Sequence, residues 1–274
     1  MEIVFSRLEE NACRFTLGPI YPAFANALRR SMIGEVPTLA IDDVRIYDNT
    51  SALFDEALAH RLGLIPIHTD LDCYVSRSVC SCDGAGCPAC TATFTMSVEG
   101  PKTVYSRDLI PEDPQTGPAD PNIPIVKLTK DQKVVIEARA VLSSGKEHAK
   151  WQPTSACGYK NYPTIRITDM CDACGQCVEE CPRGILGTAG NRVEVIEGKL
   201  EDCSLCRLCE KACLGSGIGD EAAIIVNAEP DRYIFVIEGD GSLPARQIIE
   251  RGLMHLQTRS NDLIQQIDML SGGT

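Results

Sequence analysis

The alternation of apolar and polar residues along the chain predicts a mixture of strands and helices. Residues 91–98 and 134–142 alternate with a period of two, which is typical of strands that bury one face. Two short apolar runs, at 224–226 and 233–237, predict a further pair of strands that lie side by side. Five prolines within residues 111–124 predict a mobile loop. These patterns indicate an α+β fold.

The first 20 residues predict one or two additional strands, and a helix follows them. The apolar side chains expected to face a core are Ile3, Phe5, Leu8, Cys13, Phe15 and Leu17. Pro22 suits the first turn of a helix, which Gly34 and Pro37 end. A second helix is expected over residues 51–62, and Gly63 ends it.

The most periodic segment predicts a C-terminal helix from Pro244 to Leu270, roughly 40 Å long at about 1.5 Å per residue. Its apolar stripe, broken only by a serine, consists of Ile249, Leu253, Leu256, Ser260, Leu263, Ile267 and Leu270. Such a stripe can pack on the chain's own sheet or on a partner subunit. Because one small sheet rarely covers so long a stripe, we favour a partner.

The composition of the 274-residue chain is that of a globular protein, with 44% hydrophobic and 23% charged residues. The formal net charge of −12 argues against direct DNA binding, which normally requires a basic face. No apolar run approaches the roughly 20 residues that span a membrane, and the start has no secretory signal. We therefore expect a cytoplasmic protein.

Twelve of the fifteen cysteines fall in three short groups with the spacings of metal ligands. The other three, Cys13, Cys73 and Cys157, are expected to be small buried or partly buried thiols. The first ferredoxin motif is C-x2-C-x2-C-x3-C, formed by Cys171, Cys174, Cys177 and Cys181. The second ferredoxin motif repeats this spacing with Cys203, Cys206, Cys209 and Cys213.

Two such motifs predict two 4Fe–4S clusters, with zinc or disulfides as the alternatives. In two-cluster ferredoxins the fourth cysteine of each motif ligates the other cluster. The first cluster is therefore assigned to Cys171, Cys174, Cys177 and Cys213. The second cluster is assigned to Cys203, Cys206, Cys209 and Cys181.

The remaining group, C-x-C-x4-C-x2-C, contains Cys80, Cys82, Cys87 and Cys90. Four thiolates suit a closed tetrahedral zinc site, and Gly84 and Gly86 would relax the turn between the two pairs. A thiol cluster without metal, or another metal, is the alternative.

The sequence offers no catalytic constellation. The four histidines (His60, His68, His148 and His255) are scattered, and no phosphate-binding or dinucleotide-binding motif is present. We therefore expect no enzymatic activity from the chain on its own. An alternative function is a ferredoxin-like electron-transfer subunit of an oxidoreductase, although the chain lacks a flavin or nucleotide signature.

Six segments spread over nearly the whole chain resemble the RNA polymerase alpha family. They are FANALRR at 24–30, EVP at 35–37, AID at 40–42, DEALAHRLGLIPI at 55–67, GKEHAKWQP at 145–153 and EGDGSLP at 238–244. The longer segments resemble the archaeal and eukaryotic members. The ferredoxin-like insertion beside them points to the archaeal branch of the family.

The resemblance implies three domains. Residues 1–45 with 160–168 and 219–274 would form a discontinuous dimerisation domain, 46–160 an inserted, mainly β domain with the Cys80–Cys90 group, and 169–218 a ferredoxin-like domain. The implied role is a non-catalytic assembly platform, paired with subunit L and docking the second-largest subunit and the small subunits N and P. Leu28, Arg29 and Arg30 of the first helix, together with the stripe of the last helix, would then lie at subunit interfaces. The iron–sulfur clusters would support or regulate assembly.

Overall fold

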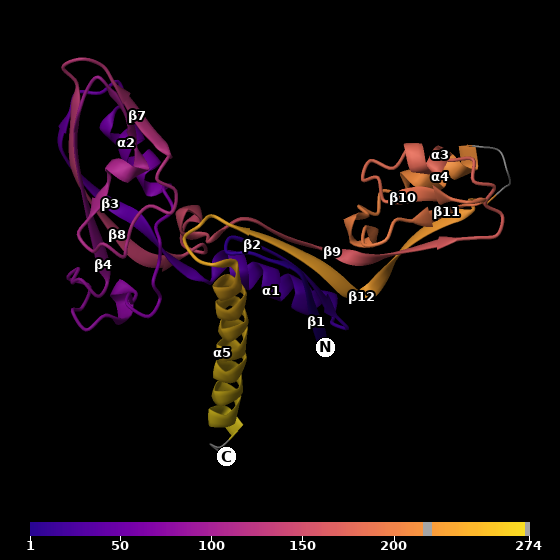
Figure 1. Cartoon of the computed structure of the whole chain (residues 1–274). Coiled ribbons are helices and arrows are strands. Elements are labelled where there is room, and N and C mark those ends of the chain that lie inside the picture. Colours follow the sequence, from indigo (N-terminus) through magenta and orange to yellow (C-terminus); the bar gives the residue numbers. More distant parts are fainter. Residues whose placement is uncertain (216–220, 272–274) are drawn as a thin grey trace. The chain divides into compact units, whose positions relative to one another are not determined.

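A computed structural model describes residues 1–215 and 221–271 of the chain (Figure 1). The helices are α1 (Pro22–Gly34), α2 (Asp55–Gly63), α3 (Gln176–Glu179), α4 (Leu208–Gly215) and α5 (Ala245–Ser271). The strands are β1 (Glu2–Leu8), β2 (Ala12–Gly18), β3 (Pro37–Asn49), β4 (Thr91–Glu99), β5 (Lys102–Tyr105), β6 (Ile110–Pro111), β7 (Pro124–Leu128), β8 (Lys133–Ser144), β9 (Thr154–Ile167), β10 (Leu186–Ala189), β11 (Arg192–Val195) and β12 (Ile224–Gly239). This mixture confirms the predicted α+β class.

The chain divides into two compact units. The first contains Met1–Ser6, Arg14–Ala25 and Tyr159–Phe235, and the second contains Arg7–Cys13, Asn26–Gly158 and Val236–Thr274. The division passes through β1, β2, β12 and β9, which form a four-stranded sheet in that order. The domain boundary expected between residues 218 and 219 lies outside the described residues, and the three-domain scheme remains a prediction.

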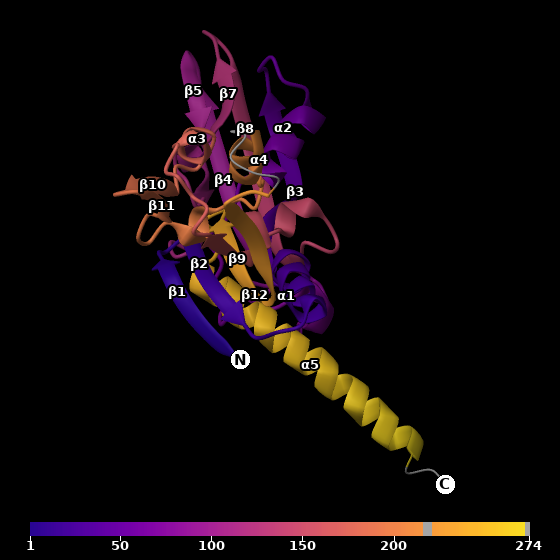
Figure 2. The same ribbon diagram turned by 90° about the vertical axis from the view of Figure 1, so that its right-hand side faces the viewer.

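The second unit is built on an antiparallel sheet in the order β3-β8-β4-β6. The predicted alternation of β4 is confirmed, since Ala92, Phe94, Met96 and Val98 are all buried. The same holds for the predicted face of β8, from Val134 to Leu142. Helix α2 lies beside the strands of this sheet (Figure 2). Two of its leucines, Leu58 and Leu62, are fully buried in the core.

Helix α2 begins at Asp55, four residues later than expected. The preceding residues form a turn instead, in which the Asn49 side chain accepts a hydrogen bond from the Ser51 hydroxyl and donates one to the Leu53 carbonyl. The proline-rich segment is a loop between Pro111, which ends β6, and Pro124, which begins β7, as predicted. Several hydrogen bonds hold it, including His68 N–H to Gly117 O (2.8 Å) and Ala119 N–H to Pro66 O (2.9 Å). These bonds tie the loop to the segment 66–68, and its mobility remains a prediction.

The first unit contains both ferredoxin motifs. The hairpin of β10 and β11 and the helices α3 and α4 surround a core in which Ile185, Leu186 and Val193 pack against cysteines from both motifs. The ends of two long strands add apolar side chains, including Ile167 of β9 and Ile224 of β12.

Two expectations for the strands are corrected. Ile3, Phe5 and Leu8 are exposed rather than in the core, because β1 is the edge strand of the four-stranded sheet. The segments 224–226 and 233–237 are not a pair of strands, because both lie in the single strand β12. Its neighbours are β2 and β9.

The predicted C-terminal helix is confirmed as α5. One face of its first turns is buried through Ala245, Ile248 and Ile249, and the Ser31 hydroxyl donates a hydrogen bond to the Gly252 carbonyl (2.8 Å) where α5 crosses α1. A Cβ atom on Gly252 would lie 2.8 Å from Met32 Cγ, so the glycine permits this close approach. Beyond Gly252 the helix is largely exposed. No helix in the described part of the chain is both long and apolar enough to cross a membrane.

Candidate metal centres and partner surface

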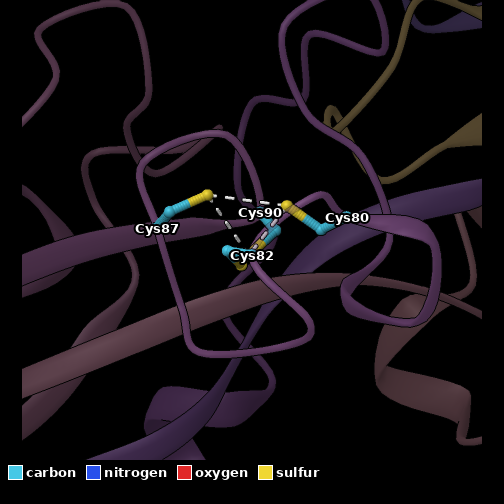
Figure 3. Close-up of side chains that lie close together, drawn as sticks. All are labelled: Cys80, Cys82, Cys87 and Cys90. Atoms are coloured by element: carbon cyan, nitrogen blue, oxygen red, sulfur yellow. Dashed lines mark hydrogen bonds between the residues drawn. The ribbon is translucent and has the colours of Figure 1, made fainter.

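The four-cysteine site, formed by Cys80, Cys82, Cys87 and Cys90, brings four sulfur atoms together in the second unit (Figure 3). The Sγ–Sγ distances are 3.4 Å for Cys80–Cys82, 3.5 Å for Cys80–Cys87, 3.6 Å for Cys82–Cys90 and 3.9 Å for Cys87–Cys90. A tetrahedral zinc ion with Zn–S bonds of about 2.3 Å would hold its sulfurs about 3.8 Å apart. The donor set and its dimensions therefore fit one tetrahedral ion.

Two tight turns give the four-cysteine site its shape. Asp83 N–H donates to Cys80 O (3.1 Å), and Cys90 N–H donates to Cys87 O (3.0 Å). Gly84 and Gly86 both have positive φ angles, 79° and 90°, which glycine adopts without strain. The two glycines thus let the chain reverse between the cysteine pairs, as their positions predicted.

The polar groups of the loop favour a thiolate at Cys82. The N–H of Cys87, followed by the thiol of Cys80 and the N–H of Gly86, lowers the pKa of Cys82 to about 5. Because metals bind the thiolate and not the thiol, this environment suits a metal ligand. All fifteen cysteines are free, so the four sulfurs are not paired as disulfides.

In the first unit, the structure brings Cys213 to the first three cysteines of the first ferredoxin motif. One small apolar cavity is lined by Cys171, Cys174, Cys177 and Cys213 together with Ile167, Asp172, Val193, Ala223 and Ile224. Burial, followed by the nearby thiols of Cys213, Cys171 and Cys174, raises the pKa of Cys177 to about 11. A bound metal would counter this effect, because it stabilises the thiolate.

A second group of four cysteines, similar to the group around Cys177, is centred on Cys209. Burial raises the pKa of Cys209 to about 11, and the thiols of Cys203, Cys181 and Cys206 add to the rise. Both fourth cysteines thus lie near the other motif, which is the arrangement that two 4Fe–4S clusters with exchanged ligands require.

The two motifs also share an unusual backbone. Ala173 and Gly175 have positive φ angles (61° and 79°), and the corresponding residues of the second motif, Leu205 and Arg207, do too (58° and 57°). For residues with a side chain this conformation costs roughly 1 kcal/mol or more, so neighbouring structure has to hold it. The repeated geometry indicates two loops shaped for the same kind of ligand.

The remaining cysteines differ in their environment. Cys13 is buried and Cys157 is partly buried, as expected, whereas Cys73 is exposed. The Cys73 thiol lies 3.3 Å from the Asp70 carboxylate, and this hydrogen bond raises the pKa of Cys73.

Two of the expected partner residues are not accessible to a partner, and two arginines of α1 are at least partly accessible. Leu28 and Ile249 are buried within the chain (1% and 6% exposed), so the prediction that they lie at an interface is wrong. Arg29 is partly buried and hydrogen-bonds Asn26, and Arg30 is exposed.

The stripe residues on the last five turns of α5 are available to a partner. Leu253, Leu263, Ile267 and Leu270 are between 39% and 82% exposed, and Leu256 is partly exposed. Three further residues that the heptad pattern did not single out, Met254, Ile264 and Met269, are also more than half exposed. Ile264 lies beside the stripe on the helix surface and widens it, whereas Met254 and Met269 lie on the opposite side of α5.

Comparison with known proteins agrees with this architecture. Residues 44–158 match the RNA polymerase Rpb3/RpoA insert domain, and residues 164–186, which include the first ferredoxin motif, match a 4Fe–4S binding domain. The chain is 45% identical over 271 residues to DNA-directed RNA polymerase subunit Rpo3 of Methanosarcina acetivorans, covering 98% of this chain and 99% of that protein. It is 36% identical over 272 residues to the Rpo3 subunit of Pyrococcus horikoshii, covering 99% and 100%.

The insert domain, the paired ferredoxin motifs and the cysteine-rich turn define a metal-binding subunit of the RNA polymerase alpha class. The chain belongs to the family of archaeal DNA-directed RNA polymerase subunit Rpo3. The resemblance found in the sequence is thereby confirmed. Members of this family are subunits of a nucleotidyltransferase complex, so other polymerase subunits are the expected partners.

Proposed function

We propose that this chain is the non-catalytic platform on which an archaeal RNA polymerase assembles. The observation that carries the proposal is the stripe of α5, which is apolar and yet largely exposed after Gly252. Exposed apolar stripes of this size mark sites of protein–protein interaction. The partner at this stripe is subunit L. The second-largest subunit and the small subunits N and P then dock on the pair, without direct DNA contact by this chain.

The ferredoxin-like segment holds two 4Fe–4S clusters in this proposal. The first cluster binds Cys171, Cys174, Cys177 and Cys213, and the second binds Cys203, Cys206, Cys209 and Cys181. The cavity that Cys213 shares with the first motif, and the cysteines grouped around Cys209, support this exchange of ligands. When bound, the clusters supply a rigid cross-link between the two loops.

The clusters act on assembly in this proposal. The core of the ferredoxin-like segment is small, and its buried side chains include three of the proposed ligands, Cys177, Cys203 and Cys209. Such a core needs the free energy of metal binding to fold. The exposed end of α5 lies in the other compact unit, so cluster loss should spare pairing with L and weaken later docking.

The four-cysteine site holds one zinc ion in this proposal, which fixes the turn before β4. The support for zinc is that the Sγ–Sγ distances are close to the separation of sulfurs expected around a tetrahedral zinc ion.

The first prediction tests the proposed platform. Leu263→Glu should abolish co-purification with subunit L, because burying an unpaired carboxylate in an apolar interface costs several kcal/mol. Leu263 is 59% exposed in the chain itself, so the change should leave its fold intact. Gln265→Glu adds the same charge on the opposite side of α5 and should keep normal L content. Normal L content in Leu263→Glu would rule out pairing through the stripe.

The second prediction tests the ligand sets by combining substitutions. Cys213→Ser should lower the iron content by about half, since one of two cubanes is lost. Adding Cys171→Ser should cause no further loss, because both cysteines ligate the first cluster. Adding Cys203→Ser instead should remove the remaining iron. The reverse pattern in anaerobic iron and sulfide analysis would show that the ligands are not exchanged.

The third prediction concerns zinc. Cys87→Ser should reduce zinc from about one ion per chain to near zero, because three thiolates leave the tetrahedral site open. The unfolding temperature of the insert should fall as well. Cys73→Ser, which changes an exposed cysteine outside the four-cysteine site, is the matched control. Metal analysis that finds equal zinc in both variants would contradict the site.

The fourth prediction separates pairing from later assembly. A chain with serine at Cys171 and Cys203 should carry neither cluster and still co-purify with L in normal amount. Recovery of the second-largest subunit should fall. Full recovery of that subunit would reject a role of the clusters in assembly, and loss of L would show that the clusters also support the dimerisation surface.

A further inference from the structure

Lys160, on β9, connects the four-stranded sheet to the second ferredoxin motif. Its Nζ donates one hydrogen bond to the carbonyl oxygen of Glu201 and another to that of Cys203, both at 2.6 Å. Cys203 is the first cysteine of the motif. All of these residues lie in the first compact unit.

Arg14, on β2, holds the same turn from a second strand. Its Nη2 donates to the Glu201 carbonyl and its Nη1 to the Asp202 carboxylate, each at 2.7 Å. Its Nε lies 3.6 Å from the Glu201 carboxylate. The short helical turn Leu200–Asp202, which leads directly into Cys203, is thus held by two cations.

These two cations lie close enough to oppose each other. Burial, and then the charge of Arg14, lowers the pKa of Lys160. The cost of placing them together is offset by the carbonyl and carboxylate oxygens of the turn. A 4Fe–4S cluster bound by four thiolates would add further negative charge near Lys160 and Arg14.

The first ferredoxin motif has a different environment. Its cavity is lined by Ile167, Val193 and Ile224, and the Asp172 carboxylate accepts a hydrogen bond from Cys174 N–H (3.1 Å). Within the residues that the structure describes, no lysine or arginine side chain hydrogen-bonds to 171–177. Both loops therefore pack against the apolar core, and ionic hydrogen bonds are an additional attachment of the second loop.

We propose that Lys160, assisted by Arg14, is a positioning residue for the second cluster. It holds the loop at Cys203 in the ligating conformation, so that retention of this cluster depends on charge while retention of the first cluster does not. The inference rests on the ligand sets of the proposed function and adds two residues, from strands of the sheet, that no cysteine motif contains.

Physical chemistry gives the size of the effect. Hydrogen bonds from a charged donor are about twice as strong as neutral ones. Losing one lowers the equilibrium constant for keeping the loop in its ligating conformation roughly ten-fold. The side chain of Arg14 is one-quarter exposed and Lys160 is partly exposed, so salt should weaken this attachment. Apolar contacts lack this sensitivity.

The experiment measures anaerobic iron release to an Fe²⁺ chelator from the full chain paired with L. The Cys213→Ser background should carry the second cluster alone, and the Cys181→Ser background the first cluster alone. In Cys213→Ser, Lys160→Met removes two such bonds and should speed release by at least about ten-fold. Arg14→Gln should also speed release, and Lys160→Arg should restore slow release. Lys199→Met removes the same charge from a lysine that contacts Gly184 instead, and should change nothing.

The dependence of iron release on salt concentration tests the inference without a substitution at Lys160. Rising ionic strength should speed release in the Cys213→Ser background and leave the Cys181→Ser background unaffected. Equal release rates with and without the Lys160→Met change, or equal salt dependence of both clusters, would overturn this inference alone. If neither background retains a single cluster before Lys160 is changed, the ligand sets fail and this inference fails with them.

Discussion

The mutual repulsion of closely spaced thiolates is the constraint on which this structure depends. Twelve cysteines are gathered into three groups, and in the four-cysteine site neighbouring sulfurs lie 3.4–3.9 Å apart. Charges this close in a partly buried site cannot all be ionised unless a cation compensates them. The cysteine loops of the ferredoxin-like segment need the same compensation of thiolate charge, and they also contain residues with positive φ angles. In the proposed function, metal binding and local folding are therefore one event in both places.

Much of the chemistry could be predicted from the sequence because it is local. Ligands such as Cys80 and Cys82, or Cys171 and Cys174, are neighbours along the chain, and their spacing alone indicates a metal site. The stripe of α5 could be predicted for the same reason, since helical periodicity needs no knowledge of the rest of the fold. Lys160 gave no such signal, because its partners, Glu201 and Cys203, are about forty residues away.

The errors have a common physical origin. An apolar strand such as β1 is expected in a core, yet position in the sheet decides burial, and β1 is the edge strand. Ile249 belongs to the periodic stripe of α5, and the family resemblance implies an interface position for Leu28, but both side chains face the interior of this chain. Periodicity identifies the apolar face of a helix and does not tell whether the chain itself or a partner covers it.

The strand order of the four-stranded sheet has a consequence for synthesis of the chain. Strand β2 ends at Gly18, but its neighbour β12 begins only at Ile224, so the sheet stays incomplete until most of the chain has left the ribosome. The sheet of β3, β8, β4 and β6 lies within residues 37–144 and can form much earlier. Contacts between distant residues form slowly, and early domains fold first during translation. Until β12 emerges, Phe15 of β2 lacks the Phe235 ring on which it stacks in the folded chain, so the apolar face of β2 is the part of the sheet that stays uncovered longest during synthesis.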